Sequence, residues 1–226
     1  MEYELVRSTT VSSPFLQMPI PTFDPDVIAK LPSGFQATAR SGMLSNPILK
    51  LIVKMADKHD FYGGNVWSAP HSIPEATLLD LAQTYPGLAT PNDAKGPALE
   101  KLICLVLMRT RVDRVLVPAL RTPSCMSHSI TLELTEQIPL RVIPAQIDER
   151  ECLLWIWLMT LECWPVESAL AKAWLVRSVM RFPEIADWEL RDFETFGNRF
   201  IWTEHLSHVL QRHRGGMWGR GQLSDV

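Results

Sequence analysis

Prolines and glycines divide the chain into short segments in which apolar residues recur at helical spacing, and this pattern limits the fold more than any other feature. Asn46-Pro47 supplies a side-chain acceptor and a preset φ at a helix start, and the apolar residues that follow predict a helix over about 47–58. Ser72 and Glu75 fit a capping box for a second, short helix, which ends at Tyr85-Pro86-Gly87.

The longest apolar segment follows Pro97. It runs from Leu99 to Leu116 and has few polar positions before Arg109, which predicts a helix whose first half is buried on nearly all sides. After two further prolines, apolar residues at 130, 132 and 134 alternate with polar ones. This alternation fits a strand and a helix equally poorly, and both interpretations stay open.

The second half of the chain is read as three helices separated by prolines. The first begins at Asp148 or earlier and ends at Trp164-Pro165, and the second covers 168–181. The third is capped by Asp187 and has Gly197 as a kink or break. Because the sequence contains no ladder of alternating strands, we predict an all-α architecture, an irregular multi-helix bundle of crossed helices.

The two ends of the chain differ from this helical part. Residues 1–30 are predicted to form an extended proline-rich arm, because proline removes amide donors and interrupts helices. Residues 31–212 form a single helical domain in this interpretation. Residues 213–226 are rich in glycine and arginine and show no period, which predicts a flexible tail.

The charge balance argues against direct nucleic-acid binding. Lys and Arg number 22 against 25 Asp and Glu, a net charge of −3, so the basic excess typical of phosphate-binding domains is missing. The longest apolar runs, Leu102–Met108 and Cys152–Met159, fall well short of the ~20 residues that a membrane span needs. The first residues show no signal-peptide pattern. We expect a protein inside the cell, without a membrane segment, whose cysteines are reduced and mostly buried: Cys104, Cys125, Cys152 and Cys163.

Few residues suggest a catalytic or metal-binding site. The candidates are close in sequence: His59 with Asp60, Cys125 with His128, and His205 and His208 with Glu204. The first pair could orient a general base, the second could place a thiol beside an imidazole, and the third could offer two imidazoles to a metal. The sequence assigns no third convergent partner to any of them. The serine elbow, the Walker loop, the Rossmann fingerprint and the helical zinc motif are all missing from the sequence. We therefore assign no catalytic residue, no metal ligand and no cofactor.

Tryptophans are concentrated in the second half. Six of the eight lie within 48 residues, and indoles bury large areas while requiring a partner for their N–H group. Such a density indicates either a thick core, which we favour, or an interaction surface. The residues singled out as candidates for an interaction surface or pocket are Trp155, Trp157, Trp174, Trp188 and Trp202.

The order of these landmarks resembles the helical regulatory region of fungal-specific transcription factors of the zinc binuclear cluster class. The similarity covers about residues 30–205 and is carried by packing motifs. They are Leu31-Pro-Ser-Gly-Phe-Gln, Ser41-Gly-Met-Leu-Ser, Leu99-Glu-Lys-Leu-Ile-Cys-Leu, Glu151-Cys-Leu-Leu-Trp-Ile-Trp, the segment around Trp174, Arg181-Phe-Pro-Glu-Ile, Asp187-Trp-Glu and Phe200-Ile-Trp.

The resemblance implies a non-enzymatic protein-interaction domain in transcriptional regulation, located in the nucleus, or alternatively in the cytoplasm. Its partner is expected to be a protein, for example a full-length transcription factor. The chain departs from the family in lacking the six-cysteine DNA-binding unit, since four scattered thiols cannot build it. Neither a DNA-contact residue nor a catalytic residue is carried over.

A second interpretation stays open. The tryptophan-rich stretch could line an apolar pocket of a small-molecule-binding protein or enzyme, with His59, Asp60, Cys125 or His128 as its polar groups. If these polar groups converge on a cavity, the structure would favour the small-molecule-binding protein or enzyme over the interaction domain.

Overall fold

Helices are the regular secondary structure in the parts of the chain that the computed structural model describes, residues 25–56, 99–115 and 125–217. No strand occurs in these parts, so the all-α prediction is confirmed. None of the helices in these ranges is both long and apolar enough to cross a membrane. The α-helices are α1 (Pro25–Lys30), α2 (Ser33–Arg40), α3 (Asn46–Ala56), α5 (Leu99–Val115), α7 (Cys125–Gln137), α8 (Ile147–Met159), α9 (Ala169–Arg181), α10 (Leu190–Gly197) and α11 (Glu204–Met217).

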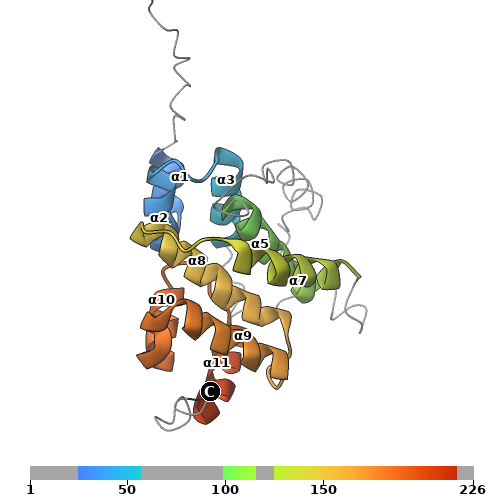
Figure 1. Cartoon of the computed structure of the whole chain (residues 1–226). Coiled ribbons are helices and arrows are strands. Elements are labelled where there is room, and N and C mark those ends of the chain that lie inside the picture. Colours follow the sequence, from blue (N-terminus) through green and yellow to red (C-terminus); the bar gives the residue numbers. More distant parts are fainter. Residues whose placement is uncertain (1–24, 57–98, 116–124, 218–226) are drawn as a thin grey trace, which may run out of the picture.

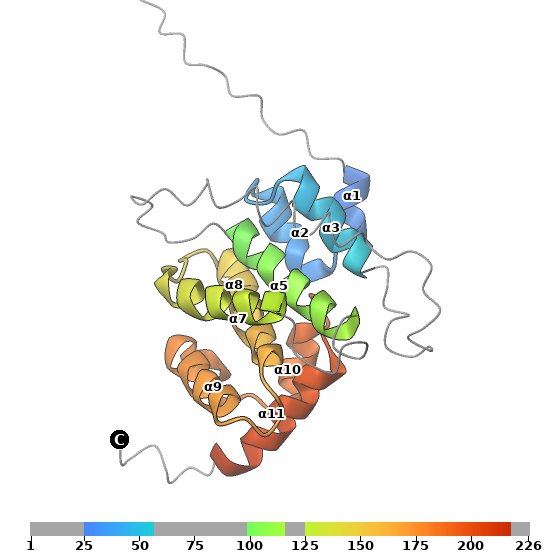
Figure 2. The ribbon, with the colours of Figure 1, turned by 90° about the vertical axis from the view of Figure 1, so that its right-hand side faces the viewer.

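The helices cross one another in three groups. Figures 1 and 2 show α1, α2 and α3 at one end and α9, α10 and α11 at the other, with α5, α7 and α8 between them. Helix α8 contacts α2, α5 and α9, so it joins the groups. The short helix predicted within 72–85 lies outside the described residues.

Two helices carry most of the interior. Every residue of α8 from Cys152 to Met159 is buried, and so is every residue of α5 from Lys101 to Thr110, as the apolar run predicted. The two cations buried in α5 have partners on α7. The Lys101 ammonium lies 2.7 Å from the Glu133 carboxylate, and the Arg109 Nε donates to the Thr131 hydroxyl at 2.9 Å. These contacts compensate for the loss of hydration and tie α5 to α7.

Residues 130–135, which the sequence left open between strand and helix, lie in α7. Ile130, Leu134 and Ile138 recur every four residues and are buried, whereas Leu132, on the opposite side, is 49% exposed. The Thr135 hydroxyl donates to the carbonyl four residues earlier, at 3.0 Å. The helical period therefore decides the structure here, because it places residues four apart on the same face.

The arm expected over residues 1–30 is not extended at its end. Residues 25–30 form α1, in which Pro25 supplies a preset φ at the first position and Asp26 lies in the first turn. Helix α1 packs against α2 and α3. The extended interpretation is therefore corrected for residues 25–30, and residues 1–24 lie outside the described part.

The cap predicted at Asp187 is displaced by two residues. Asp187 ends a short 3-10 turn (Pro183–Asp187), and α10 begins only at Leu190. Glu189 and Asp192 form the capping box, in which the Glu189 N–H donates to the Asp192 carboxylate at 2.6 Å. This reciprocal pair satisfies the first amides of the helix better than a single side chain does.

Two glycines allow helices and aromatic rings to approach closely. Gly197 ends α10, as predicted, and a Cβ at this position would lie 1.8 Å from the Trp202 ring. Gly34, in α2, faces Phe200, whose ring would lie 2.5 Å from an added Cβ. Both positions therefore exclude any side chain unless an aromatic ring moves.

The last helix extends beyond the expected end of the domain. Helix α11 continues to Met217, so residues 213–217 of the expected tail are helical. Residues 218–226 lie outside the described part of the chain.

Candidate functional site

The tryptophans of α8 and α9 are interior residues. Trp155, Trp157 and Trp174 are each at most 3% exposed. The Trp155 indole N–H donates to the carbonyl of Ile201 at 2.7 Å, and the Trp174 N–H donates to the carbonyl of Trp157 at 2.9 Å. The first bond joins α8 to the segment between α10 and α11, and the second joins α9 to α8, so these indoles fasten the C-terminal segments to α8.

Aromatic rings pack around these indoles in two clusters. In the first, Trp155 stacks on Phe200 at 5.8 Å and meets the edge of Phe35 at 5.0 Å. In the second, Trp157 stacks on Trp174 at 4.5 Å. Trp188 is half-buried and lies 5.2 Å from both Phe193 and Phe196. The tryptophan-rich stretch is thus a packed core at Trp155, Trp157 and Trp174, in agreement with the core interpretation.

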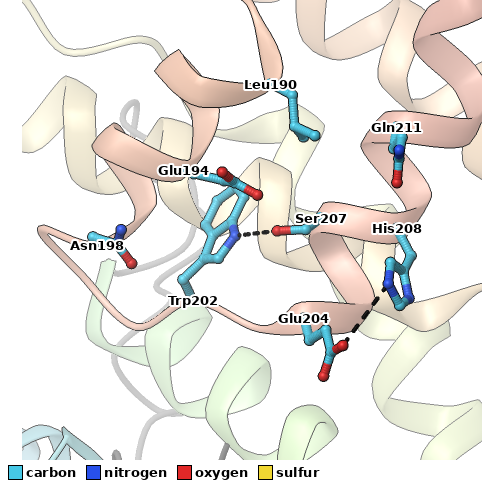
Figure 3. Close-up of a pocket in the computed structure, with 8 residues that line it drawn as sticks. All are labelled: Leu190, Glu194, Asn198, Trp202, Glu204, Ser207, His208 and Gln211. Atoms are coloured by element: carbon cyan, nitrogen blue, oxygen red, sulfur yellow. Dashed lines mark hydrogen bonds and ion pairs between the residues drawn. The ribbon is translucent and has the colours of Figure 1, made fainter.

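Trp202 borders a pocket. This pocket has a volume of about 420 Å³ and lies between α10 and α11 (Figure 3). The Trp202 N–H donates to the Ser207 hydroxyl at 2.9 Å, and the His208 Nε2 lies 3.9 Å from the Glu204 carboxylate. Ser207 is therefore engaged with an indole rather than with an imidazole. A nucleophile paired with a general base is not assembled at this pocket.

The ionisable candidates do not converge in the described residues. His128 is an exposed residue in the first turns of α7, and Cys125 is the first residue of the same helix. The His205 Nε2 lies 3.3 Å from the carbonyl of Trp164, whereas the His208 Nε2 lies 3.9 Å from the Glu204 carboxylate. His59 and Asp60 lie outside the described residues. Across 25–56, 99–115 and 125–217, no group of three His, Cys, Asp or Glu side chains could hold a metal ion.

Burial suppresses the reactivity of three cysteines. It raises the pKa of the Cys104 thiol from 9.0 to about 12, and it raises the pKa values of Cys152 and Cys163 as well. For Cys163, the neighbouring Arg109 guanidinium partly opposes this effect. Since the thiolate is the nucleophile, these thiols are inert at neutral pH.

Sequence reasoning missed a set of exposed apolar side chains around the connection between α7 and α8. Residues 141–146 form the connector, and the apolar rim consists of Leu140, Val142 and Ile147, which are 69%, 55% and 68% exposed. A connector groove of about 530 Å³ is lined by the connector residues, Val142 of the apolar rim among them, and by Ser41 and Met43 from the α2–α3 loop. The available signal was a run of apolar residues at 140, 142, 143 and 147, interrupted by Pro144.

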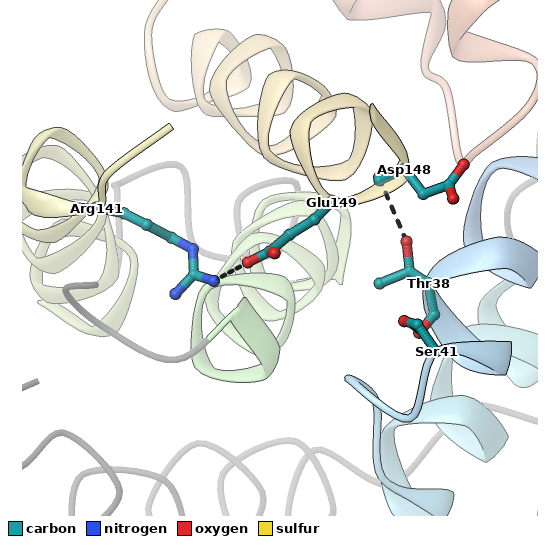
Figure 4. Close-up of polar contacts among 5 residues, drawn as sticks. All are labelled: Thr38, Ser41, Arg141, Asp148 and Glu149. Atoms are coloured by element: carbon teal, nitrogen blue, oxygen red, sulfur yellow. Dashed lines mark hydrogen bonds and ion pairs between the residues drawn. The ribbon is translucent and has the colours of Figure 1, made fainter. Parts of the chain in front are cut away.

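Polar contacts hold the walls of the connector groove in place. Arg141 pairs with Glu149 in the first turns of α8, and the Thr38 hydroxyl donates to the Asp148 carbonyl at 3.3 Å (Figure 4). The Arg181 guanidinium, at the end of α9, donates to the Arg141 carbonyl at 2.6 Å. The connector is therefore fixed at its start by groups from α8 and α9.

Comparisons with protein-family models, with curated proteins and with solved structures find no match to this chain. The site therefore has to be interpreted from its own geometry and chemistry.

Proposed function

We propose that the chain is a non-enzymatic protein-interaction domain that acts in transcriptional regulation and docks a protein partner at the connector groove. The observation that carries this proposal is the apolar rim. Three large aliphatic side chains are more than half exposed within eight residues of sequence, and one of them, Val142, lines the groove. Soluble proteins seldom leave such side chains clustered on their surface unless a partner covers them.

The chemistry of the described residues supports a binding role rather than catalysis. The buried thiols have raised pKa values, and the pocket beside Trp202 pairs its serine with an indole. The aromatic residues that could have lined a ligand pocket are engaged with one another in the core. Recognition is therefore left to the surface.

The regulatory part of the proposal rests on the resemblance to fungal-specific transcription factors. The motifs of that resemblance include Trp155, Trp157 and Phe200, which are core residues here. The net charge of −3 supports contact with a protein, such as a full-length transcription factor, rather than with DNA. The proposed location is the nucleus.

A tethering assay tests this function. The full chain is fused to an unrelated DNA-binding domain in a fungal host, and transcription of a reporter bearing sites for that domain is measured. We expect the fusion to change reporter transcription relative to the DNA-binding domain alone. The triple substitution L140S/V142S/I147S should abolish most of this change, because it removes the apolar rim.

The matched control is L132S/L170S, which removes exposed apolar side chains elsewhere, on α7 and α9. This control should keep the effect of the wild-type fusion. A fusion that leaves transcription unchanged while it is present in the nucleus would contradict the proposed function.

A further inference from the structure

Helix α9 has a second apolar side in addition to the one that it buries. The helix lies at the edge of the fold and packs on α8 (Figure 2). Its buried residues are Ala171, Trp174, Leu175 and Ser178. The opposite side, named here the α9 stripe, consists of Ala169, Ala173, Val176 and Met180. Val176 is half-buried and the other three are exposed, Met180 to 78%.

The α9 stripe has the spacing by which helices pair with each other. Its members are 4, 3 and 4 residues apart in the sequence, which is the spacing of the d and a positions of a coiled-coil seam. They fall within about 60° of arc on the helix surface. The two alanines allow another helix axis to approach to about 8 Å. An extended partner would gain no main-chain bonds, because the backbone groups of α9 are bonded within the helix.

Two cations border the α9 stripe, one on each side. Lys172 and Arg177 occupy the g and e positions of the seam, which set the choice of partner in coiled coils. Both side chains are exposed, and neither has an ion pair or hydrogen bond with any residue that the structure describes. The carboxylates nearest in sequence, Glu167 and Glu184, pair instead with arginines of α11 and α8 at 3.3 and 2.7 Å.

The charge of α9 is opposite to that of the whole chain. The helix contains three cations and no acidic residue, although the chain has a net charge of −3. Cations at the flanks of an apolar seam attract a helix whose own flanks are acidic, and they repel one whose flanks are basic. The charge pattern therefore selects the partner by its sign.

From the α9 stripe and its two unpaired cations we infer that α9 docks an amphipathic helix of a protein partner, whose apolar seam packs on the stripe and whose acidic flanking residues pair with Lys172 and Arg177. The residues that line the connector groove come from other segments. The inference therefore adds a second interaction surface and does not depend on the proposed function.

Other occupants match the α9 stripe less well. In a parallel pair of two α9 helices, Lys172 would face Arg177 of the second copy, and in an antiparallel pair like residues would face each other. Both arrangements place cation against cation. A membrane surface is a poorer match too, because two of the four stripe residues are alanines, which insert little apolar area into lipid.

The test uses the full chain and a display library of helical peptides of about 21 residues, three heptads. The peptides have leucine at the seam positions, and their flanking positions vary among Glu, Gln and Lys. Peptides that bind the wild type are retained if M180S weakens their binding and L170S does not. Leu170 is the matched control because it is 62% exposed but lies about a quarter turn from the stripe. We expect Glu at most flanking positions of the retained peptides.

Charge reversal then tests the ion pairs. K172E/R177E should weaken binding of the retained peptides at least about tenfold in fluorescence anisotropy. The control K30E/K50E changes the net charge equally, at exposed positions of α1 and α3, and should have little effect. Replacing the flanking Glu residues of a peptide with Lys should restore its binding to K172E/R177E. Circular dichroism checks that each variant keeps the wild-type helical signal.

Several outcomes would overturn the inference. They are retained peptides with mostly Gln or Lys at the flanks, equal binding to wild type and K172E/R177E, and recovery of no retained peptide. A wild-type dimer in sedimentation velocity that M180S abolishes would overturn it in favour of a second copy. Binding to phosphatidylserine-containing vesicles that K172E/R177E abolishes would overturn it in favour of a membrane surface.

Discussion

The hydrogen bond of one buried indole can be isolated by a pair of identical substitutions. Trp155 and Trp157 lie two residues apart in α8 and are 0% and 3% exposed. The Trp155 N–H donates to the carbonyl of Ile201, whereas the buried Trp157 N–H finds no acceptor among the described residues. Replacing each with phenylalanine removes the same atoms, so the transfer and cavity contributions are similar in the two variants.

The difference between the variants follows from their hydrogen bonds. Trp155→Phe leaves a buried carbonyl without its donor, which costs about 1–3 kcal/mol. Trp157→Phe removes a buried donor that lacks a partner, so a comparable amount of the free energy of unfolding is recovered in this variant. Trp155→Phe should therefore lower the free energy of unfolding by at least about 2 kcal/mol more than Trp157→Phe does.

Urea titration monitored by circular dichroism at 222 nm measures this difference without depending on tryptophan fluorescence. Equal losses of stability in the two variants would show that the Trp155 bond adds nothing beyond packing. A larger loss for Trp157→Phe would refute the reasoning altogether.

Three further outcomes are expected. Gly197→Ala should lower the free energy of unfolding by about 1–3 kcal/mol in urea titrations, because its Cβ would overlap the Trp202 ring, and a neutral effect would contradict the packing described. Burial raises the pKa of Cys104 from 9.0 to about 12, so its contribution to the free energy of unfolding is fully present below pH 9 and declines by about 1.4 kcal/mol per pH unit towards pH 12. Cys104→Val should therefore make the decline of stability between pH 9 and 10.5 shallower. An unchanged slope would refute the shift. The hydrogen bond from Arg150 lowers the pKa of Glu184 below 4.5. Glu184→Gln should therefore lower the free energy of unfolding by up to about 1 kcal/mol at pH 7, since the pair is partly exposed. The difference in stability between wild type and variant should vanish as the pH falls through the lowered pKa.

The sequence predicted those parts of the fold in which local signals and packing agree. The apolar run after Pro97 predicted a buried helix, and Leu99–Val115 is helical with its first half buried. Gly197 was identified as a break because glycine disfavours helix interiors, and α10 ends there. In each case a local signal and the packing favour the same structure.

The parts that were missed depend on contacts between distant segments. Residues 130–135 became helical because Ile130 and Leu134 pack on the same side of α7, a choice that alternation in the sequence obscured. The apolar rim could not be identified from the sequence, because Leu140 and Ile147 have the composition of core residues and only the arrangement of α7, α8 and α9 leaves them exposed. Exposure of an apolar residue is a property of the whole fold.

Hydrogen exchange of the full chain tests most directly whether the tryptophans belong to the interior while the connector faces solvent. The account predicts that the amides of 142–145 exchange rapidly and that those of Cys152–Met159 exchange slowly. Rapid exchange within Cys152–Met159, or protection of the connector equal to that of α8, would contradict it.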